Sequence, residues 1–239
     1  MRTLSTFLLL SLTMLGACAD CPDAFELRER RVVRAGQRVS LSLPDGQLTL
    51  VGRERSTTLE LEARGCRARG GASIVSDSLD DAAALRVAAR HADVRAFVPA
   101  GTEVVVRHGS GNVQIRAVGP ADVETRGGRV RIEQAIGQVR VEAGPGSLYV
   151  REVVGDVEVV DGPGAVFLEG VLGSVRVRDG SGGIHLREIE GDVLIEADGS
   201  GAVEARSIAG DVVVRAKSDD ARMIRTNDVG GSVRLPNDR

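Results

Sequence analysis

The amino-acid sequence predicts an all-β fold, a right-handed parallel β-solenoid with about 18 residues and two strands per coil. Three observations support this prediction. Short apolar-x-apolar units recur at a fixed spacing of nine residues. Two kinds of glycine turn alternate between the units. Aromatic residues make up only 2% of the chain and Trp is absent, so Val, Ile and Leu have to fill the interior, and β-branched side chains suit strands.

The repeated units are typical of strands with one buried face, because apolar and polar residues alternate with period two. Units at the nine-residue spacing begin at Val130, Val139, Leu148, Val157, Val166, Val175, Ile184 and Val193. The series continues with small insertions at Val203, Val212, Met223 and Val233, and has weaker members at Val113 and Val123. Such coils bury their apolar residues only against neighbouring coils, so we expect a continuous stack of six or seven between residues 109 and 235.

The turns indicate that the true period is eighteen. A Gly-x-Gly turn such as Gly180-Ser181-Gly182 alternates with a turn of one glycine and a polar residue, such as Gly191-Asp192. An 18-residue coil also stacks opposite charges in two outward columns, Glu133, Arg151, Glu169 and Arg187 on one face and Arg140, Glu158 and Arg176 on the other. A nine-residue coil would instead place Glu133 beside Glu142.

The sequence before residue 109 has strand-like runs without a fixed period. They are Arg38 to Leu43, Gln47 to Val51, Thr58 to Ala63, Ala92 to Val98 and Glu103 to Arg107. Asp80 to Ala89 fits a helix, an Ala-rich strand or a loop. We predict a signal segment over 1–17, an irregular β cap over 18–108 and the solenoid over 109–239, with cap and solenoid forming one continuous domain.

The N-terminal segment indicates export. Phe7 to Leu15 is an apolar run too short to cross a bilayer, and it ends in Leu15-Gly16-Ala17-Cys18, which resembles a bacterial lipobox. In a lipobox the cysteine, here Cys18, carries the lipid and becomes the first mature residue. An ordinary secretory signal cleaved near Ala17 or Ala19 is the alternative. Ala19 after the cysteine favours, by analogy with lipoproteins, the outer membrane.

The two remaining cysteines, Cys21 and Cys66, form an even pair in an oxidising compartment. A disulfide between them would close a loop of 45 residues (66 minus 21), which the chain-entropy argument values at roughly 4 kcal/mol. It would also hold the folded body close to the lipid.

The repeats resemble a known family. Gly180-Ser181-Gly182-Gly183-Ile184 followed by Gly191-Asp192-Val193, and Gly199-Ser200-Gly201-Ala202-Val203 followed by Gly210-Asp211-Val212, look like the bacterial "putative adhesin" β-strand-repeat domain. The lead-in from Val98 to Val104 is also similar to that family. The resemblance covers most of the mature chain and implies a β-solenoid with an adhesin-like role. It supplies no catalytic residues.

Aspartates recur at both turns. Asp161, Asp179 and Asp198 are expected in one column, and Asp156, Asp192 and Asp211 in the other. Stacked carboxylates could bind Ca²⁺ or act as a general acid and base, whereas the simpler interpretation is turn chemistry in which each carboxylate accepts a backbone N–H. The calcium nonapeptide pattern is not met, because Asp precedes Gly-x-Gly instead of following it.

One outward column contains rings. Tyr149, Phe167 and His185 occupy the same position of three successive Gly-x-Gly strands, with Arg131 and Glu204 on either side. We expect either a stacking platform for a sugar, a peptide or a partner protein, or cross-strand pairing that only stabilises the sheet. The other histidines, His91 and His108, have no metal-ligand spacing, and the sequence indicates no cofactor, metal or catalytic set.

These features predict a non-enzymatic envelope lipoprotein that presents a rigid sheet face to polysaccharide or protein, held at the membrane by its lipid. A structural or assembly role is the alternative, and a polysaccharide-active β-helix enzyme is disfavoured by the short turns. The formal net charge of -3 argues against nucleic acid as a partner.

Overall fold

The computed structural model describes residues 24–33, 37–66, 74–77, 82–87, 90–197, 201–216 and 224–236. These residues form β-strands joined by turns. The strands are β1 (Ala24–Val32), β2 (Arg38–Arg53), β3 (Thr58–Cys66), β4 (Ile74–Asp77), β5 (Ala82–Val87), β6 (Arg90–Pro99), β7 (Val104–Ser110), β8 (Val113–Val118), β9 (Ala121–Gly127), β10 (Val130–Ile136), β11 (Val139–Ala143), β12 (Gly146–Val154), β13 (Val157–Val171), β14 (Val175–Ser181), β15 (Ile184–Ile189), β16 (Val193–Ala197), β17 (Val203–Ile208), β18 (Val212–Ala216), β19 (Ile224–Val229) and β20 (Val233–Arg234).

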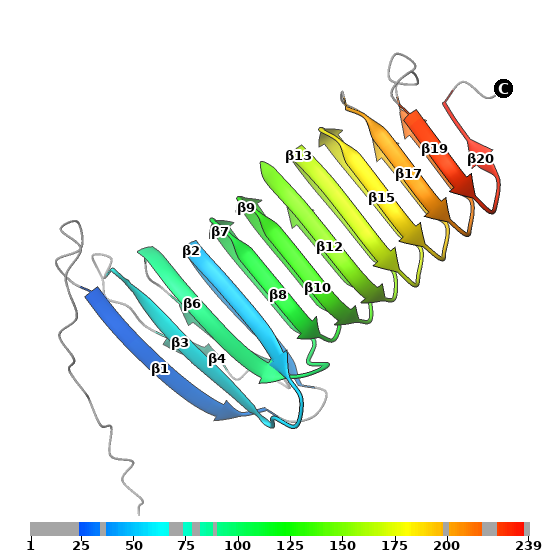
Figure 1. The fold of residues 1–239 in the computed structure, drawn as a ribbon. Helices are drawn as coiled ribbons and strands as arrows, with labels where there is room; N and C mark the ends of the chain where they lie inside the picture. The colour runs from blue at the N-terminus through cyan, green and yellow to red at the C-terminus, as the bar shows by residue number, and fades with distance from the viewer. Residues whose placement is uncertain are drawn as a thin grey trace, which may run out of the picture.

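The strands stack as the rungs of a solenoid with two faces (Figure 1). Sheet A contains, in spatial order, β1, β3, β6, the second half of β2, β8, β10, β12, the second half of β13, β15, β17 and β19. Sheet B contains β4, β5, the first half of β2, β7, β9, β11, the first half of β13, β14, β16, β18 and β20. Because β2 and β13 run from one sheet into the other, each of them makes a whole coil by itself. The predicted all-β parallel solenoid is confirmed.

The predicted period is confirmed as well. In sheet A, Val130 pairs with Leu148, Leu148 with Val166, and Val166 with Ile184, each 18 residues further on. The spacing falls to 17 from Val113 to Val130 and reaches 19 from Ile184 to Val203. Inward positions along this ladder from Val113 to Ile208 are buried, and they hold Val, Leu, Ile and Ala.

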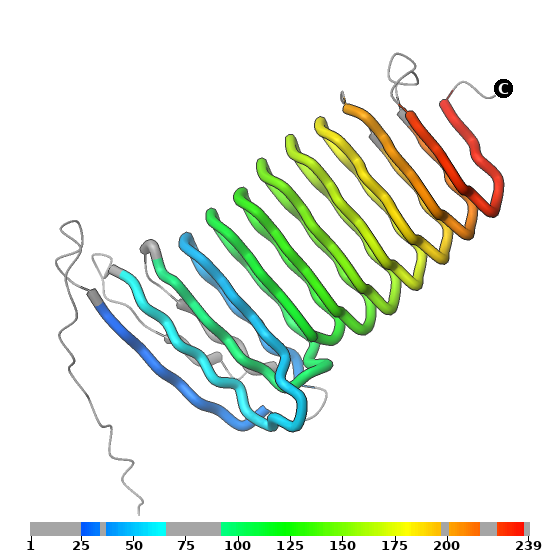
Figure 2. Tube along the Cα trace, viewed as in Figure 1, coloured from blue at the N-terminus to red at the C-terminus, as the bar shows by residue number. Residues whose placement is uncertain are grey.

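The N-terminal region is more regular than the sequence indicated. The strand β2 already forms a parallel coil, and its parallel partners are β5 and β6 on one side and β7 and β8 on the other. The β5–β6 coil comes later in the chain than β2 but lies outside it, so β6 separates β3 from β2 (Figure 2). Of the three alternatives for Asp80 to Ala89, the strand is observed, as β5.

Antiparallel strands close this end of the stack. In sheet A, β3 pairs antiparallel with β6 and β1 pairs antiparallel with β3, while β4 pairs antiparallel with β5 in sheet B. The outermost strand β1 carries charges that pair with those of β3, as in the contacts of Arg30 with Glu60 (3.3 Å) and Arg64 with Glu26 (3.1 Å). A charged outer strand of this kind discourages further edge-to-edge pairing.

Glycine stacks allow the coils to approach one another at the turns. The second glycine of each Gly-x-Gly turn lies directly over the same glycine of the previous coil, so a Cβ on Gly182 would overlap the carbonyl oxygen of Gly164. The other turn has its own stack, where a Cβ on Gly191 would come within 2.6 Å of Gly173. These glycines are therefore required by space, and Gly182 also has a positive φ of 145°.

A corner of unusual conformation ends each sheet-A strand. At this corner, each strand of sheet A from β8 to β19 has one residue with a positive φ: Ala117 (55°), Gln134 (57°), Glu152 (55°), Gly170 (67°), Glu188 (57°), Ser207 (53°) and Asp228 (57°). This residue points outward directly after another outward residue, so the period-two alternation is broken and the chain bends toward the turn. Only Gly170 occupies the position without the strain that a Cβ adds there.

We predict that Gly182→Ala lowers the free energy of unfolding by more than about 3 kcal/mol, because the new methyl overlaps the backbone of the neighbouring coil. Gly170→Ala is the matched control. Its Cβ would meet Glu152 only at 3.6 Å, so we expect a loss of about 1 kcal/mol from the positive φ alone. Urea unfolding of both variants measures the difference, and equal midpoints would contradict the steric argument.

Candidate functional site

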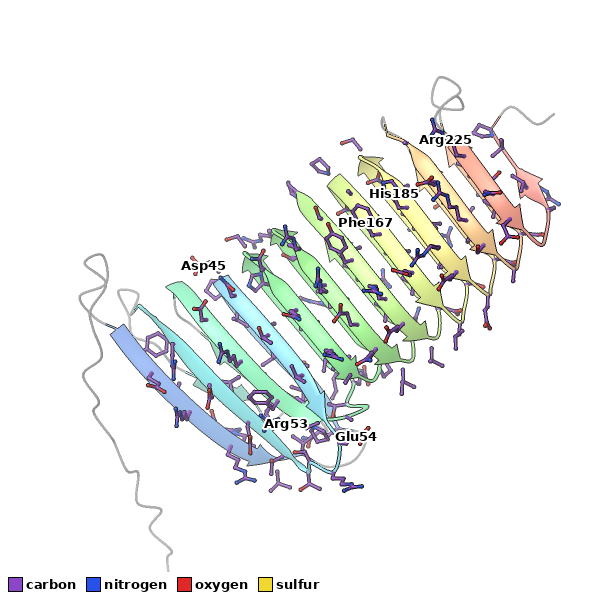
Figure 3. All side chains as sticks on the ribbon, viewed as in Figure 1. Asp45, Arg53, Glu54, Phe167, His185 and Arg225 are labelled. Atoms are coloured by element: carbon purple, nitrogen blue, oxygen red, sulfur yellow. The ribbon has the colours of Figure 1, made fainter. Side chains whose placement is uncertain are left out.

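The predicted ring column is a continuous stack on sheet A. The ring centroids of Tyr149 and Phe167 lie 4.8 Å apart with an interplanar angle of 4°, and those of Phe167 and His185 lie 4.8 Å apart at 6°. The parallel register places the three side chains on β12, β13 and β15. Figure 3 shows Phe167 and His185 side by side on adjacent strands. We call these three residues the ring ladder.

The ring faces in the ladder are covered by neighbouring side chains, so the ring ladder presents ring edges to solvent. Phe167 has a ring stacked on each face. The guanidinium of Arg131 lies 5.5 Å from the centroid of the Tyr149 ring, and Nδ1 of His185 lies 3.2 Å from a carboxylate oxygen of Glu204. A sugar therefore cannot stack face to face on Phe167. Since aromatic edges carry positive partial charge, the exposed row favours oxygen atoms of a ligand.

A column of charged residues runs beside the ring ladder. The register pairs Glu133 with Arg151, Arg151 with Glu169, and Glu169 with Arg187, as the alternating-charge argument predicted. The carboxylate of Glu169 contacts both neighbours, Arg151 at 3.2 Å and Arg187. Two guanidiniums thus share the carboxylate of Glu169, and Arg187 also contacts Glu188 at 3.5 Å, so the column is a network of ion pairs.

A shallow groove of about 400 Å³ lies between the ring ladder and the charged column. The charged residues lining it are Arg131, Arg151, Glu169, Arg187, Glu204 and Arg206. Four arginines against two glutamates give this surface a positive balance, although the whole chain has a formal net charge of -3. The groove can therefore offer guanidinium donors along one wall and ring edges along the other, which suits a ligand rich in oxygen. We call this feature the ladder groove.

The turn aspartates of one column fasten neighbouring coils together. An Oδ1 atom of Asp156 accepts the backbone N–H of Ser174 (2.9 Å), Asp192 accepts that of Asp211 (2.9 Å), and Asp211 accepts that of Ser232 (2.7 Å). The hydrogen bond from Ser232 is the main reason that the pKa of Asp211 is lowered. The turn interpretation is confirmed for this column.

The other aspartate column points into the solenoid. Asp161 and Asp179 lie opposite each other on adjacent coils and are 6% and 5% exposed. Burial, followed by the charge of Asp179, raises the pKa of Asp161 to about 7, although its carboxylate accepts the N–H of Gly162. Ala197 takes the next place in the register, and Asp198 lies outside the described residues. No external substrate reaches this pair, so it does not form an acid–base site for polysaccharide.

The other residues singled out from the sequence do not line the ladder groove. Cys18, Cys21 and the side chains of Cys66 and His91 lie outside the described residues, although the backbone of Cys66 pairs with Ala24, three residues after Cys21. His108 is buried, and burial is the main cause of its lowered pKa. Among the described residues, no group of three or more His, Cys, Asp or Glu side chains could hold a metal ion. That same part of the chain has no helix with the length and apolar character to cross a membrane.

Sequence reasoning found the ring ladder and its flanks but missed the groove wall. Arg151, Glu169 and Arg187 were recognised only as a test of the coil period, and Arg206 was not singled out. Their register with the rings was the signal that could have found them, since residues two apart on one strand lie on the same face. The ladder groove combines two outward columns, whereas the sequence was interpreted one column at a time.

Known proteins share little sequence with this chain. No family model matches the sequence, and no curated protein matches it. Among solved structures, the chain is similar to a protein named "putative adhesin" from Bacteroides fragilis, with 10% identity and a TM-score of 0.38 over 88% of this chain and 96% of the other. It is also similar to a "putative cell adhesion protein" from Clostridium sporogenes, with 12% identity and a TM-score of 0.28 over 88% and 98%. Both names refer to adhesion, and the fold of this chain is established by its own strand ladders.

Because Asp161 is buried beside Asp179, we predict that the free energy of unfolding depends on pH. The pKa of Asp161 is about 7 in the fold against a usual 3.8, so the folded protein keeps a proton that the unfolded chain releases between these values. The contribution of Asp161 to stability is therefore most favourable below pH 4 and falls as the pH rises to 7, by at most about 1.4 kcal/mol per pH unit. Asp161→Asn cannot ionise, so it should exceed the parent in stability at pH 8 and lose this advantage at pH 4.5.

Urea unfolding at the two pH values measures the effect. Asp211→Asn is the matched control with the opposite sign, because its carboxylate has a lowered pKa and stabilises the fold when ionised. A parent pH slope that persists in Asp161→Asn would show that the buried pair is not its source.

Proposed function

We propose that this protein is a non-enzymatic lipoprotein of the cell envelope that binds polysaccharide along sheet A, and that the ladder groove is the binding site. The observation that carries the proposal is the pairing of the two groove walls. One wall is a row of ring edges repeated every 4.8 Å, and the other is a row of guanidiniums and carboxylates at the same repeat.

A polysaccharide matches both walls. Its hydroxyl and ring oxygens can accept hydrogen bonds from Arg151 and Arg187 and lie against the positive ring edges, while its hydroxyl groups can donate to Glu169. An apolar ligand would leave these charged groups desolvated without partners, which costs free energy. The groove is open and shallow, as suits a chain lying on a surface.

The rigid backbone supports the same function. Every ring of the ladder sits on a strand whose neighbours on both sides are hydrogen-bonded in register, so the spacing of the binding groups is fixed before a ligand arrives. A preorganised site loses little conformational entropy on binding. A scaffold of this kind needs no moving loop to bind a repeating polymer.

The ladder is tested by changing Tyr149, Phe167 and His185 together to Ser in the full chain, purified in mild detergent. On an array of neutral and acidic glycans we expect affinity to fall at least about tenfold for every glycan that the parent binds. Loss of two stacked ring pairs should also cost roughly 1–3 kcal/mol of stability, which leaves a stacked solenoid able to fold.

The matched control changes Glu142, Val160 and Arg178 to Ser. These three residues point outward from sheet B and stack on one another in the same coils as the ring ladder. Equal loss of binding in both triple variants would assign the effect to damaged coils, and full binding by the ladder variant would overturn the proposed site.

The anchor is tested independently at Cys18. In a bacterial host that exports and lipidates proteins, we expect the parent in the outer-membrane fraction and the Cys18→Ser variant among soluble or unprocessed forms. Fractionation and labelling with a radioactive fatty acid measure this. Incorporation of label into Cys18→Ser would contradict the lipidation site.

A further inference from the structure

The ladder groove continues beyond Arg131 into a second groove on the same face. The second groove has a volume of about 230 Å³, and its lining residues are Gln47, Leu48, Thr49, Asn112, Val113, Gln114, Arg129 and Arg131. They come from β2, from β8 and the turn before it, and from β10 and the turn before it, and these three strands precede β12 in the spatial order of sheet A. Arg131 lines both grooves, so it marks their junction.

We propose that the two grooves form one track for an acidic polysaccharide, and that Arg131 binds a carboxylate of that polymer at the junction. This proposal rests on the proposed function and specifies its ligand. The track crosses seven neighbouring strands of sheet A from β2 to β17, and six strand spacings give it a length of roughly 29 Å.

Charge is the first argument for an acidic ligand. Five arginines line the whole track, namely Arg129, Arg131, Arg151, Arg187 and Arg206. Only two carboxylates are among its lining residues, and both already contact other side chains: Glu169 contacts Arg151 and Arg187, and Glu204 contacts His185 and Arg206. The second groove has no carboxylate in its lining. A neutral polymer would leave this positive balance uncompensated.

The state of Arg131 is the second argument. Arg131 is exposed, and it forms no ion pair with any carboxylate of the described residues. Its guanidinium is held only by the Tyr149 ring, at 5.5 Å from the ring centroid. A guanidinium stacked on a ring keeps its edge donors available, and this planar fork matches a carboxylate with two parallel hydrogen bonds.

The side chains of the second groove suit the uncharged parts of the same polymer. Gln47, Thr49 and Gln114 offer amide and hydroxyl groups, which both donate and accept hydrogen bonds, as sugar hydroxyls do. Thr49 and Gln114 lie in the same outward column as Arg131 and the ring ladder. The polymer would therefore run along the solenoid axis, across the strands.

The test compares acidic polymers with neutral forms of themselves. Oligomers of polygalacturonate, alginate and hyaluronate of three, six and nine sugars are titrated into the full chain in detergent, beside the same oligomers after chemical reduction of their carboxyl groups. For at least one acidic series we expect tighter binding than for the reduced series, affinity that rises with length, and weaker binding at higher salt.

Single substitutions test which residues bind the acidic oligomer. Arg131→Gln should weaken binding of the acidic oligomer about 10- to 100-fold and weaken binding of the reduced oligomer much less. Gln114→Ala should weaken the nine-sugar oligomer but not the three-sugar one. Arg178→Gln, on the opposite sheet, is the matched control and should change neither.

The outcomes separate this proposal from the proposed function. Equal binding of acidic and reduced oligomers, or binding independent of length, would overturn the acidic track but leave the ladder groove as a glycan site. Failure of all three acidic polymers, with other array glycans still bound through the ladder, would do the same. Tighter binding of an aspartate-rich peptide than of any oligomer would point to a protein ligand and overturn both proposals.

Discussion

Every coil of this solenoid depends on the backbone of its neighbour at the two turns. The strands can pair along their length only if the turns also approach to the strand spacing, and a side chain at the stacked glycine positions would hold them apart. The two glycine stacks therefore decide whether the coils close on one another. Once they close, each inward Val, Leu or Ile is buried against equivalent residues above and below, and the nearest-neighbour contacts add up along the stack.

The same constraint produces the ladder groove. Side chains in equivalent places of successive coils must stack at the repeat of the backbone, so three rings in one column become a ladder with a fixed spacing and nearly parallel planes. A column of alternating charges becomes a chain of shared ion pairs for the same reason. The groove between them needs no special loop, because it follows from the arrangement of two columns on one sheet.

Much of the regular part could be predicted because it is repetitive. The glycine turns and the charge columns fixed the register from Val130 to Val193, and the ring ladder followed from that register. The N-terminal coil could not be found in this way, since β2 pairs with strands about 65 residues later and no period connects Val39 with Val104. The inward direction of Asp161 was also hidden, because turn chemistry explains an Asp beside a glycine without reference to the core. The corner residues have no shared type, from Ala117 to Glu188, so no residue pattern in the sequence predicts their positive φ.

The position of β2 has a consequence for how the chain assembles as it is synthesised. A polypeptide leaves the ribosome with its N-terminus first, yet β2 lies between partners that are made later, β5 and β6 on one side and β7 and β8 on the other. Residues 38–53 therefore have no parallel neighbour until β5 and β6 have been made, and they keep one open edge until Val118 has been added. An apolar strand with open edges invites wrong pairing, so this strand is the segment that a chaperone would have most reason to bind during synthesis.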